Sequence, residues 1–306
     1  MFYYAYARKL LTLYPHLGEL GIYFPSYYDD WGGDQLSAFN TIPFTEITQR
    51  DIPHMQKMVG ISFKLLRKMV TILNSDWYDA VTIKLQPLLN QYGVYEPINE
   101  CYLSPIDSRF NDVWCSGISE NPCYFNDIRK KLMKEFTPRL SLLEHNKRLM
   151  ETIIESNSVC LSIRKGDFLV PGNEKYDICD DMYYASAIDH MKRHVSNMKL
   201  IVFSDDIEFV KHNMHFDVPV IFENNDGKDP TWEKLRLMYS CKHYIISNST
   251  FSWWSQYLSR NDDRIVIAPR PWRVGEYCDY FYDNHTSTLN ATSGEPDDLA
   301  ASGRIV

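Results

Sequence analysis

The sequence predicts an α/β protein with a parallel sheet in its C-terminal half. From residue 159 onward, short apolar segments alternate with segments whose apolar residues recur at helical spacing. Strands that alternate with helices in this way pair in parallel through right-handed crossovers. Three of the apolar segments also end in polar clusters, and open α/β sheets bind ligands at the carboxyl ends of their strands. The second half is therefore predicted to be a Rossmann-like domain with a binding site along one edge of its sheet.

The elements of this domain follow one another in regular order. The predicted strands are residues 159–163, 200–203, 218–222, 244–246 and 265–268. The predicted helices are residues 181–195, 205–213, 231–241 and 250–258. Within the first helix, Tyr184, Ile188 and Met191 recur at intervals of four and three residues, which places them on one face.

The first half of the chain is less regular. Its patterns predict helices over residues 2–14, 60–74, 125–136 and 140–155, and extended segments over residues 20–24, 81–83 and 93–95. The pattern changes after residues 156–158, which predicts two domains, residues 1–155 and 156–289. The tail, residues 290–306, is small, polar and acidic with almost no apolar period, so we expect it to be disordered.

Composition and charge exclude several classes of protein. The chain has 306 residues, of which 44% are hydrophobic and 24% charged, as in soluble globular proteins. Its net charge of −8 argues against a general nucleic-acid binder. No apolar run is long enough to span a bilayer, and residues 1–9 lack the order of a signal peptide. We therefore expect a cytoplasmic protein, either free or peripheral to the inner membrane.

The cysteines support the same compartment. There are seven, an odd number, and no two of them form a Cys-x-x-Cys pair. This usage predicts free thiols in a reducing compartment and argues against a disulfide framework or a zinc site.

The first polar cluster is Arg164-Lys165-Gly166-Asp167, directly after strand 159–163. An arginine at a strand end can hold a diphosphate with its planar fork, whereas lysine acts as a point charge. Gly166 allows the backbone to approach a ligand closely. Asp167 can either fix the arginine or accept a sugar hydroxyl. An ordinary surface ion pair explains these four residues equally well.

The second cluster is Ser204-Asp205-Asp206, at the end of strand 200–203. One residue of this cluster is expected to cap the following helix, because Ser and Asp accept hydrogen bonds from its first N–H groups. A cap does not need two carboxylates in succession. The role of the remaining aspartate stays open, and the edge of guanine and a ribose hydroxyl are its candidate partners.

The third cluster is Asn248-Ser249-Thr250-Phe251, where a strand runs straight into a helix. The free N–H groups at a helix start, its positive dipole end and the two hydroxyls beside them suit an anion. The alternative is an ordinary helix cap. The tryptophans that follow, Trp253 and Trp254, are predicted to be packing residues.

Metal ligands are not evident in the sequence. It contains no cysteines at metal-binding spacing and no Asp-x-Asp. A sugar-nucleotide enzyme without a metal must stabilise its diphosphate leaving group with arginine, lysine and helix termini. The three clusters supply such groups.

Together these motifs resemble the α-1,2-fucosyltransferases, bacterial and vertebrate enzymes that use GDP-fucose. The family's His-x-Arg-Arg-Gly-Asp-Tyr motif corresponds to residues 162–168, and its Phe-Ser-Asp-Asp strand end to residues 203–206. Its most specific block is Leu-Met-x-x-Cys-Lys-His followed by Asn-Ser-Thr-Phe-Ser-Trp-Trp, which matches residues 237–243 and 248–254. The resemblance covers nearly the whole chain.

The resemblance implies a GT-B architecture of two Rossmann-like domains, with residues 1–155 on the acceptor side and residues 156–289 binding the GDP-sugar. It implies inverting, metal-independent transfer of L-fucose from GDP-fucose to the 2-hydroxyl of a galactose-terminated glycan, without a cofactor. Arg164 and Asp167 are then the catalytic candidates. The candidate donor-binding residues are Arg164, Lys165, Gly166, Ser204, Asp205, Asp206, Asn248, Ser249, Thr250 and Phe251. The general base stays open among Asp167, Glu120, His16 and His54.

The chain departs from the family pattern in two places. Ser162, Lys165 and Phe168 stand where the family has His, its second Arg and Tyr. Family members also have a strand and a Gly-Gly-Leu-Gly-Asn-Gln loop before a Met-Phe-x-Tyr-Ala segment, which here is residues 1–5. We therefore expect the N-terminal domain to lack its first strand. Two alternatives follow: a GDP-sugar-binding protein made inactive by that loss, and a fucosyltransferase that builds another linkage.

Overall fold

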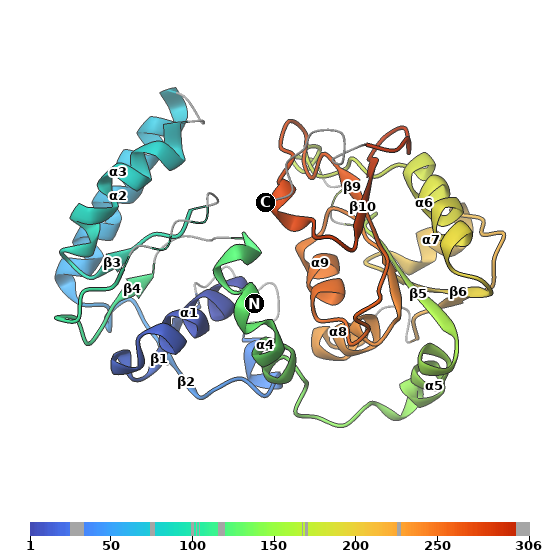
Figure 1. The fold of residues 1–306 in the computed structure, drawn as a ribbon, viewed down its shortest axis with the longest axis horizontal. Coiled ribbons are helices and arrows are strands. Elements are labelled where there is room, and N and C mark those ends of the chain that lie inside the picture. Colours follow the sequence, from blue (N-terminus) through green and yellow to red (C-terminus); the bar gives the residue numbers. More distant parts are fainter. Residues whose placement is uncertain are drawn as a thin grey trace. The chain divides into compact units, whose positions relative to one another are not determined.

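The computed structural model of the protein describes residues 1–24, 34–73, 77–98, 101, 103, 105–115, 120–166, 168, 171–224 and 228–297. The chain divides into two compact units, Met1–Glu135 and Phe136–Val306 (Figure 1). The division comes earlier in the chain than the predicted one at residue 155.

A six-stranded parallel sheet forms the centre of the C-terminal unit (Figure 1). Its strands are β5 (Asn157–Ile163), β6 (Met198–Ser204), β7 (Val220–Phe222), β8 (His243–Ile245), β9 (Val266–Arg270) and β10 (Thr286–Asn290). They lie in the order β10-β9-β8-β5-β6-β7, so the chain order reverses between β5 and β8. In folds of this kind the crevice beyond that pair of strands is where ligands bind. The predicted α/β class and parallel sheet are confirmed.

Helices cover both faces of this sheet. They are α5 (Lys147–Glu155), α6 (Asp181–His194), α7 (Ile207–Asn213), α8 (Thr231–Tyr239) and α9 (Thr250–Tyr257). Val159, Leu161 and Ile163 of β5 lie in one core cluster with residues of α6 and α7. Ser162 points the other way, and its Oγ lies 2.5 Å from Oγ of Ser252 on α9. Because successive side chains of a strand face opposite sides, β5 is buried on both.

Residues 136–155 belong to the C-terminal unit because they pack against its helices. The ring of Phe136 lies 5.3 Å from the ring of Trp254 on α9, centroid to centroid. The N–H of Leu143 donates to Oε1 of Glu233 on α8 at 2.9 Å. These contacts join residues about a hundred positions apart, which explains why the domain boundary differs from the prediction. They also hold residues 140–146 outside a regular α-helix, and the helix predicted over residues 140–155 begins only at Lys147.

The predicted disordered tail is ordered in its first part. The strand β10 ends at Asn290, whose N–H donates to the carbonyl of Glu295 at 2.8 Å. Arg270 Nη1 lies 2.9 Å from Oδ1 of Asp297, and this ion pair ties the turn to β9. The prediction of disorder is therefore wrong for residues 290–297, while residues 298–306 lie outside the described residues.

The N-terminal unit is built from shorter elements. They are α1 (Phe2–Leu13), β1 (Leu20–Tyr23), β2 (Phe44–Ile47), α2 (His54–Leu73), α3 (Trp77–Asn90), β3 (Val94–Tyr95), β4 (Trp114–Cys115) and α4 (Arg129–Glu135). In the described ranges the strands form two separate parallel pairs, β1–β2 and β3–β4. A second Rossmann-like domain, and with it the GT-B architecture, therefore stays a prediction.

Two predictions for this unit need correction. Residues 81–83, predicted as extended because of their β-branched side chains, lie within α3. The helix predicted over residues 60–74 begins earlier, at His54. In both places the helices α2 and α3 pack against β3, where Phe63, Leu89 and Val94 are buried together. This packing outweighs the local conformational preference of the residues concerned.

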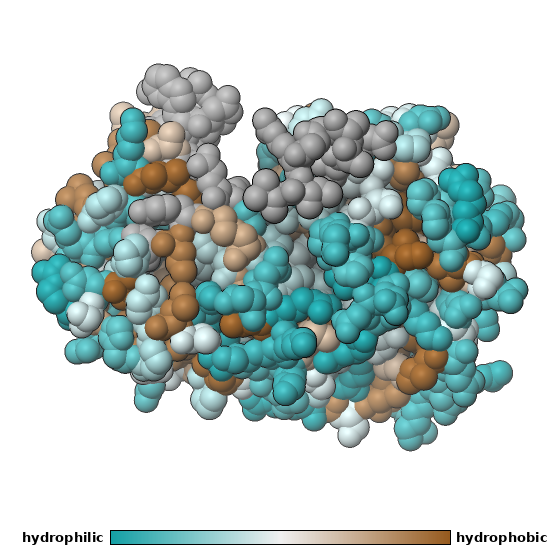
Figure 2. Space-filling model, in the orientation of Figure 1, coloured by the Kyte–Doolittle hydropathy of each residue, from teal (hydrophilic) through white to brown (hydrophobic). Residues whose placement is uncertain are grey.

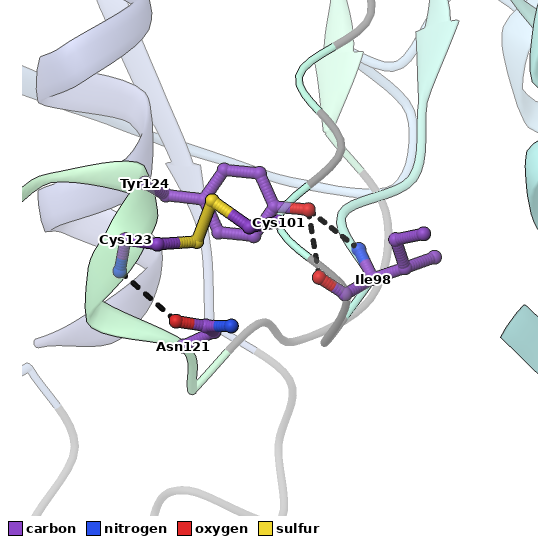
Figure 3. Close-up of a disulfide and its surroundings, with 5 residues drawn as sticks. All are labelled: Ile98, Cys101, Asn121, Cys123 and Tyr124. Atoms are coloured by element: carbon purple, nitrogen blue, oxygen red, sulfur yellow. Dashed lines mark hydrogen bonds between the residues drawn. A yellow bond between two sulfur atoms is a disulfide. The ribbon is translucent and has the colours of Figure 1, made fainter. Parts of the chain in front are cut away.

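A disulfide corrects the prediction that all cysteines are free. Cys101 and Cys123 are bonded, and their Cα atoms lie 6.0 Å apart. Figure 3 shows that the bond joins the same two segments as Tyr124, whose hydroxyl contacts both the N–H and the carbonyl of Ile98. The five remaining cysteines are free. The sequence analysis did not find this disulfide, because the number of cysteines is odd and the two bonded cysteines lie 22 positions apart.

Loss of the disulfide is expected to destabilise the N-terminal unit. Closing a loop between residues 22 positions apart restricts the unfolded chain, and a crosslink of this size contributes about 3 kcal/mol. Cys101→Ser should therefore lower the free energy of unfolding by about this amount in urea titrations, and Cys278→Ser is the matched free-thiol control. Dithiothreitol should destabilise the native chain and leave Cys101→Ser unchanged. A native chain that unfolds identically with and without the reductant contradicts this prediction.

On the face drawn in Figure 2, apolar side chains lie in small groups among hydrophilic ones. No helix within the described ranges has both the length and the apolar character needed to cross a bilayer.

Candidate functional site

The structure brings the first two polar clusters together at the carboxyl edge of the sheet. Ile163, the last residue of β5, is in register with Ser204, the last residue of β6. The loop that follows β5 therefore lies beside the loop that follows β6. Arg164, Lys165 and Gly166 come from the first loop and Asp205 from the second.

The carboxylate of Asp205 holds the backbone of the first loop. Its Oδ1 accepts the N–H of Lys165 at 2.9 Å and the N–H of Gly166 at 3.1 Å. Its Oδ2 lies 3.2 Å from Nε of Arg164. A Cβ at position 166 would meet the carboxylate at 3.0 Å, which explains why glycine stands there. Asp205 thus fixes the arginine. The sequence analysis considered this role for Asp167, which lies outside the described residues.

The cap of α7 is Asp206. Its side chain accepts the N–H of Phe209 at 2.9 Å, and the Oγ of Ser204 accepts the N–H of Asp206 at 3.1 Å. Ser204 also donates its N–H to Oε1 of Glu223 at 2.9 Å. Burial raises the pKa of Glu223 above its ordinary value, and the nearby Lys234 partly offsets this. Of the two neighbouring aspartates, one holds the arginine loop and the other caps the helix.

Asn248, predicted to bind the ligand, holds a neighbouring segment of the chain. We call residues 173–180 the strap. Asn248 Nδ2 donates to the carbonyl of Tyr176 at 2.8 Å, and its Oδ1 accepts the thiol of Cys179 at 3.4 Å. Burial raises the pKa of Cys179 to about 12, so this thiol keeps its proton and can donate it. The contact between Asn248 and Tyr176 joins residues 72 positions apart, and no sequence pattern predicts it.

The strap in turn contacts Lys165 directly and Arg164 through the ring of Phe168. The Tyr176 ring stacks on Phe168 with centroids 5.6 Å apart, and the guanidinium carbon of Arg164 lies 5.1 Å from the Phe168 centroid. Asp177 Oδ1 lies 3.4 Å from Nζ of Lys165. The guanidinium of Arg164 is therefore held by Asp205 and by the Phe168 ring, on which Tyr176 stacks. The sequence analysis missed Tyr176 and Asp177 because they belong to an irregular loop.

Two further cations lie at the strap. Lys175 Nζ is 4.8 Å and Arg273 Cζ is 5.8 Å from the centroid of the Tyr176 ring. The backbone N–H of Val274 donates to the carbonyl of Lys175 at 3.2 Å, so the loop after β9 packs on the strap. Cations therefore meet here, and carboxylates such as Asp177 and Asp205 lie among them.

The third cluster begins α9, as predicted. Ser249 is the N-cap residue in extended conformation, and its side chain makes no capping bond. Its carbonyl accepts the N–H of Trp253 at 2.9 Å, so the first helical hydrogen bond forms there. The N–H groups of Thr250 and Phe251 come before that bond and have no acceptor within the helix. This end of α9 follows β8 at the switch point, beside β5, and its dipole favours an anion.

Contacts within the C-terminal unit account for Trp253, Trp254 and Ser162. Trp253 and Trp254 are buried, with Trp253 Nε1 donating to the carbonyl of Phe281 at 2.8 Å. Ser162, which stands in place of the family's histidine, contacts Ser252 on α9 and thereby connects β5 with the third cluster. Both tryptophans pack, as the sequence predicts.

A depression next to the site has the wrong charge for a phosphate. It is lined by Lys165, Asp180, Asp181, Met182 and Phe209. Its two carboxylates repel anions, and one of them, Asp180, caps α6 by accepting the N–H of Tyr183 at 3.0 Å. The arginine side of the loop therefore suits a diphosphate better. Within the described ranges no group of three or more His, Cys, Asp or Glu is arranged to hold a metal ion.

Removal of the Asn248 amide is expected to weaken ligand binding without unfolding the protein. Asn248→Ala releases the strap from the segment that precedes α9, so Asp177 no longer fixes Lys165 and Tyr176 no longer supports Phe168 against Arg164. The dissociation constant for GDP, the ligand that the resemblance implies, should rise roughly tenfold, the equivalent of about one charge-assisted hydrogen bond. Isothermal titration calorimetry measures this. Asn213→Ala is the matched control, because that amide contacts only the end of its own helix. Equal affinities for native protein and Asn248→Ala would refute the positioning role of the strap.

Two curated glycosyltransferases are similar to part of this chain. The chain is 37% identical over 164 residues to an alpha-1,2-colitosyltransferase of Escherichia coli, covering 51% of this chain and 54% of that protein. It is 25% identical over 158 residues to the human galactoside alpha-(1,2)-fucosyltransferase 1, covering 47% and 43%. The chain thus spans about half the length of the curated relatives it matches.

Among solved structures, a glycosyl transferase family 9 protein from Veillonella parvula DSM 2008 is similar at 14% identity and a TM-score of 0.31, covering 57% of this chain and 52% of that one. The family model of glycosyl transferase family 11 matches residues 69–284, which include the three clusters, the strap and the switch point. The protein therefore belongs to glycosyl transferase family 11 and is related to the α-1,2-fucosyl- and α-1,2-colitosyltransferases.

Proposed function

We propose that this protein transfers L-fucose from GDP-fucose to the 2-hydroxyl of a galactose-terminated glycan, with inversion and without a metal or cofactor. One observation carries the proposal: Arg164 is held by Asp205 and the Phe168–Tyr176 pair at the switch point of a family 11 sheet. A fixed guanidinium at that place suits a diphosphate. The two relatives named above for α-1,2 transfer support the linkage.

In this proposal the protein accelerates departure of GDP. Negative charge grows on the diphosphate as the bond to the sugar carbon breaks, and positive charge develops on the sugar. Arg164, Lys165 and the N–H groups of Thr250 and Phe251 stabilise the growing negative charge. Because Asp205 and the strap fix the arginine beforehand, little reorganisation is needed during the reaction. The acceptor hydroxyl attacks the opposite face of the sugar and loses its proton late. Asp167 remains the predicted second catalytic residue.

A colitose donor is the second candidate. The relative named a colitosyltransferase is more similar to this chain, at 37% identity, than the human fucosyltransferase, at 25%. Colitose is L-fucose without its 3-hydroxyl, so the two donors share the same GDP and the same reacting carbon. The phosphate site fits both, and only contacts to the sugar ring separate them.

Parallel assays with each of the two donors test the proposal. The protein is incubated with GDP-fucose or GDP-colitose, a panel of galactosides and a chelator, and the release of GDP and the product linkage (by NMR) are measured. A 2-fucosylated galactoside formed in the presence of chelator is the expected result. A 2-colitosylated product identifies the second candidate, and another linkage identifies a different fucosyltransferase. GDP binding without any transfer would refute both and leave a GDP-sugar-binding protein.

A further inference from the structure

Helix α2 of the N-terminal unit exposes a row of apolar side chains. One side of the helix packs inward, where Phe63 is buried with Leu89 and Val94. Other sides of the helix are exposed to solvent. The exposed apolar residues are Met55 (58%), Met58 (49%), Ile61 (46%), Leu65 (61%), Leu66 (39%) and Met69 (62%). With 3.6 residues per turn, Met55, Met58, Leu65 and Met69 lie within about 80° of one another around the helix axis, so they form a stripe along the helix.

Positive charge lies on another side of the same helix, about 120° around its axis from the middle of the stripe. Lys64 and Lys68 are exposed and occupy a second row of the same helix. Lys57, half-buried, lies in that row as well and donates to the carbonyl of Gln49 at 3.3 Å. The sequence of α2 contains no aspartate or glutamate. In a chain with a net charge of −8, a 20-residue helix without acidic residues is an uncommon concentration of cations.

We propose that α2 docks on the surface of an anionic phospholipid bilayer. An apolar stripe on one side and a row of lysines on another are typical of helices that lie in the membrane interface. In this arrangement Met55, Leu65 and Met69 enter the acyl-chain boundary, and Lys64 and Lys68 remain at the anionic headgroups. The stripe runs along a convex helix, and a fluid bilayer accommodates such a ridge without a matching groove. The inference is independent of the proposed donor and acceptor.

Vesicle flotation tests this docking surface. The full chain is mixed with vesicles of phosphatidylcholine alone or of phosphatidylcholine with phosphatidylglycerol. Binding to the anionic vesicles alone, reduced at high salt, is the expected result. Lys64→Gln with Lys68→Gln should lower the partition coefficient about 25-fold, because each lysine near such a surface contributes roughly a factor of five. The control pair is Lys147→Gln with Lys211→Gln, in the C-terminal unit.

A second variant pair tests the apolar stripe. Leu65→Ser with Met69→Ser should lower the partition coefficient at least tenfold. Ile154→Ser with Met182→Ser is the matched control, because each of those side chains is 61% exposed. Circular dichroism checks the fold. If the variant with both stripe substitutions unfolds, the variant with both lysine substitutions still tests the proposal.

Four results would overturn the proposal: no binding to anionic vesicles, equal binding to neutral ones, unchanged binding of the folded lysine pair, or unchanged binding of the folded stripe pair. A dimer that the stripe variants convert to monomer in light scattering, together with no vesicle binding, identifies a second copy of the chain as the occupant instead.

Discussion

Arg164→Ala is expected to reduce kcat/KM by a factor on the order of 100 to 1,000. The guanidinium is positioned by Asp205 at 3.2 Å from its Nε and by the Phe168 ring, and its loss removes the main preorganised positive charge facing the diphosphate. Deleting one preorganised donor of developing charge typically costs this much. Steady-state assays of GDP release measure the effect.

Arg164→Lys separates charge from geometry. Lysine keeps the charge but lacks the planar fork that binds two oxygens at once, so only part of the rate should return. Arg193→Ala, an exposed arginine in the last turn of α6, is the control and should retain native kinetics. A folded Arg164→Ala variant with native kcat/KM would show that the diphosphate lies elsewhere.

Asp205→Ala is expected to weaken GDP binding about 100-fold, whereas Asp206→Ala leaves binding within a factor of two. These neighbours have the same side chain but different partners. Asp205 holds two N–H groups and the arginine of the first loop, and its removal leaves all three without their carboxylate. Asp206 only caps α7, so its loss should cost about 1 kcal/mol of stability. Calorimetry and thermal unfolding of both variants separate the two roles.

Asp205→Asn refines this prediction. The amide oxygen can still accept the N–H groups of Lys165 and Gly166, but it carries no charge for Arg164. Affinity for GDP should therefore fall between those of the native protein and Asp205→Ala. If Asp205→Ala and Asp206→Ala weaken GDP binding equally, the assignment of one aspartate to the loop and the other to the cap is wrong.

The sequence predicted the C-terminal sheet well because its physical signals are local. Strand β5 is buried on both faces and therefore reads as a continuous apolar run. Strand β10 was missed because Thr286, Ser287 and Thr288 are polar, and only pairing with β9 makes them a strand. In α3 the β-branched residues 81–83 suggested a strand, but packing against α2 keeps them helical.

Part of the site could also be predicted from the sequence. The strand-end clusters pointed to Arg164, Lys165, Gly166 and Asp205, which the structure brings into contact. Two features needed three-dimensional information. The choice between Asp205 and Asp206 depends on which carboxylate reaches the neighbouring loop. Asn248 holds the strap through contacts 69 and 72 positions away, and such distances leave no periodic signal.

The central claim is that a GDP diphosphate binds at the switch point between β5 and β8. Amide hydrogen exchange with and without GDP tests it most directly, because it reports protection along the whole chain. The account predicts that GDP slows exchange at residues 164–166 and in the first turn of α9, at Thr250 and Phe251. Protection found only within Met1–Glu135, or none at these positions under saturating GDP, would contradict it.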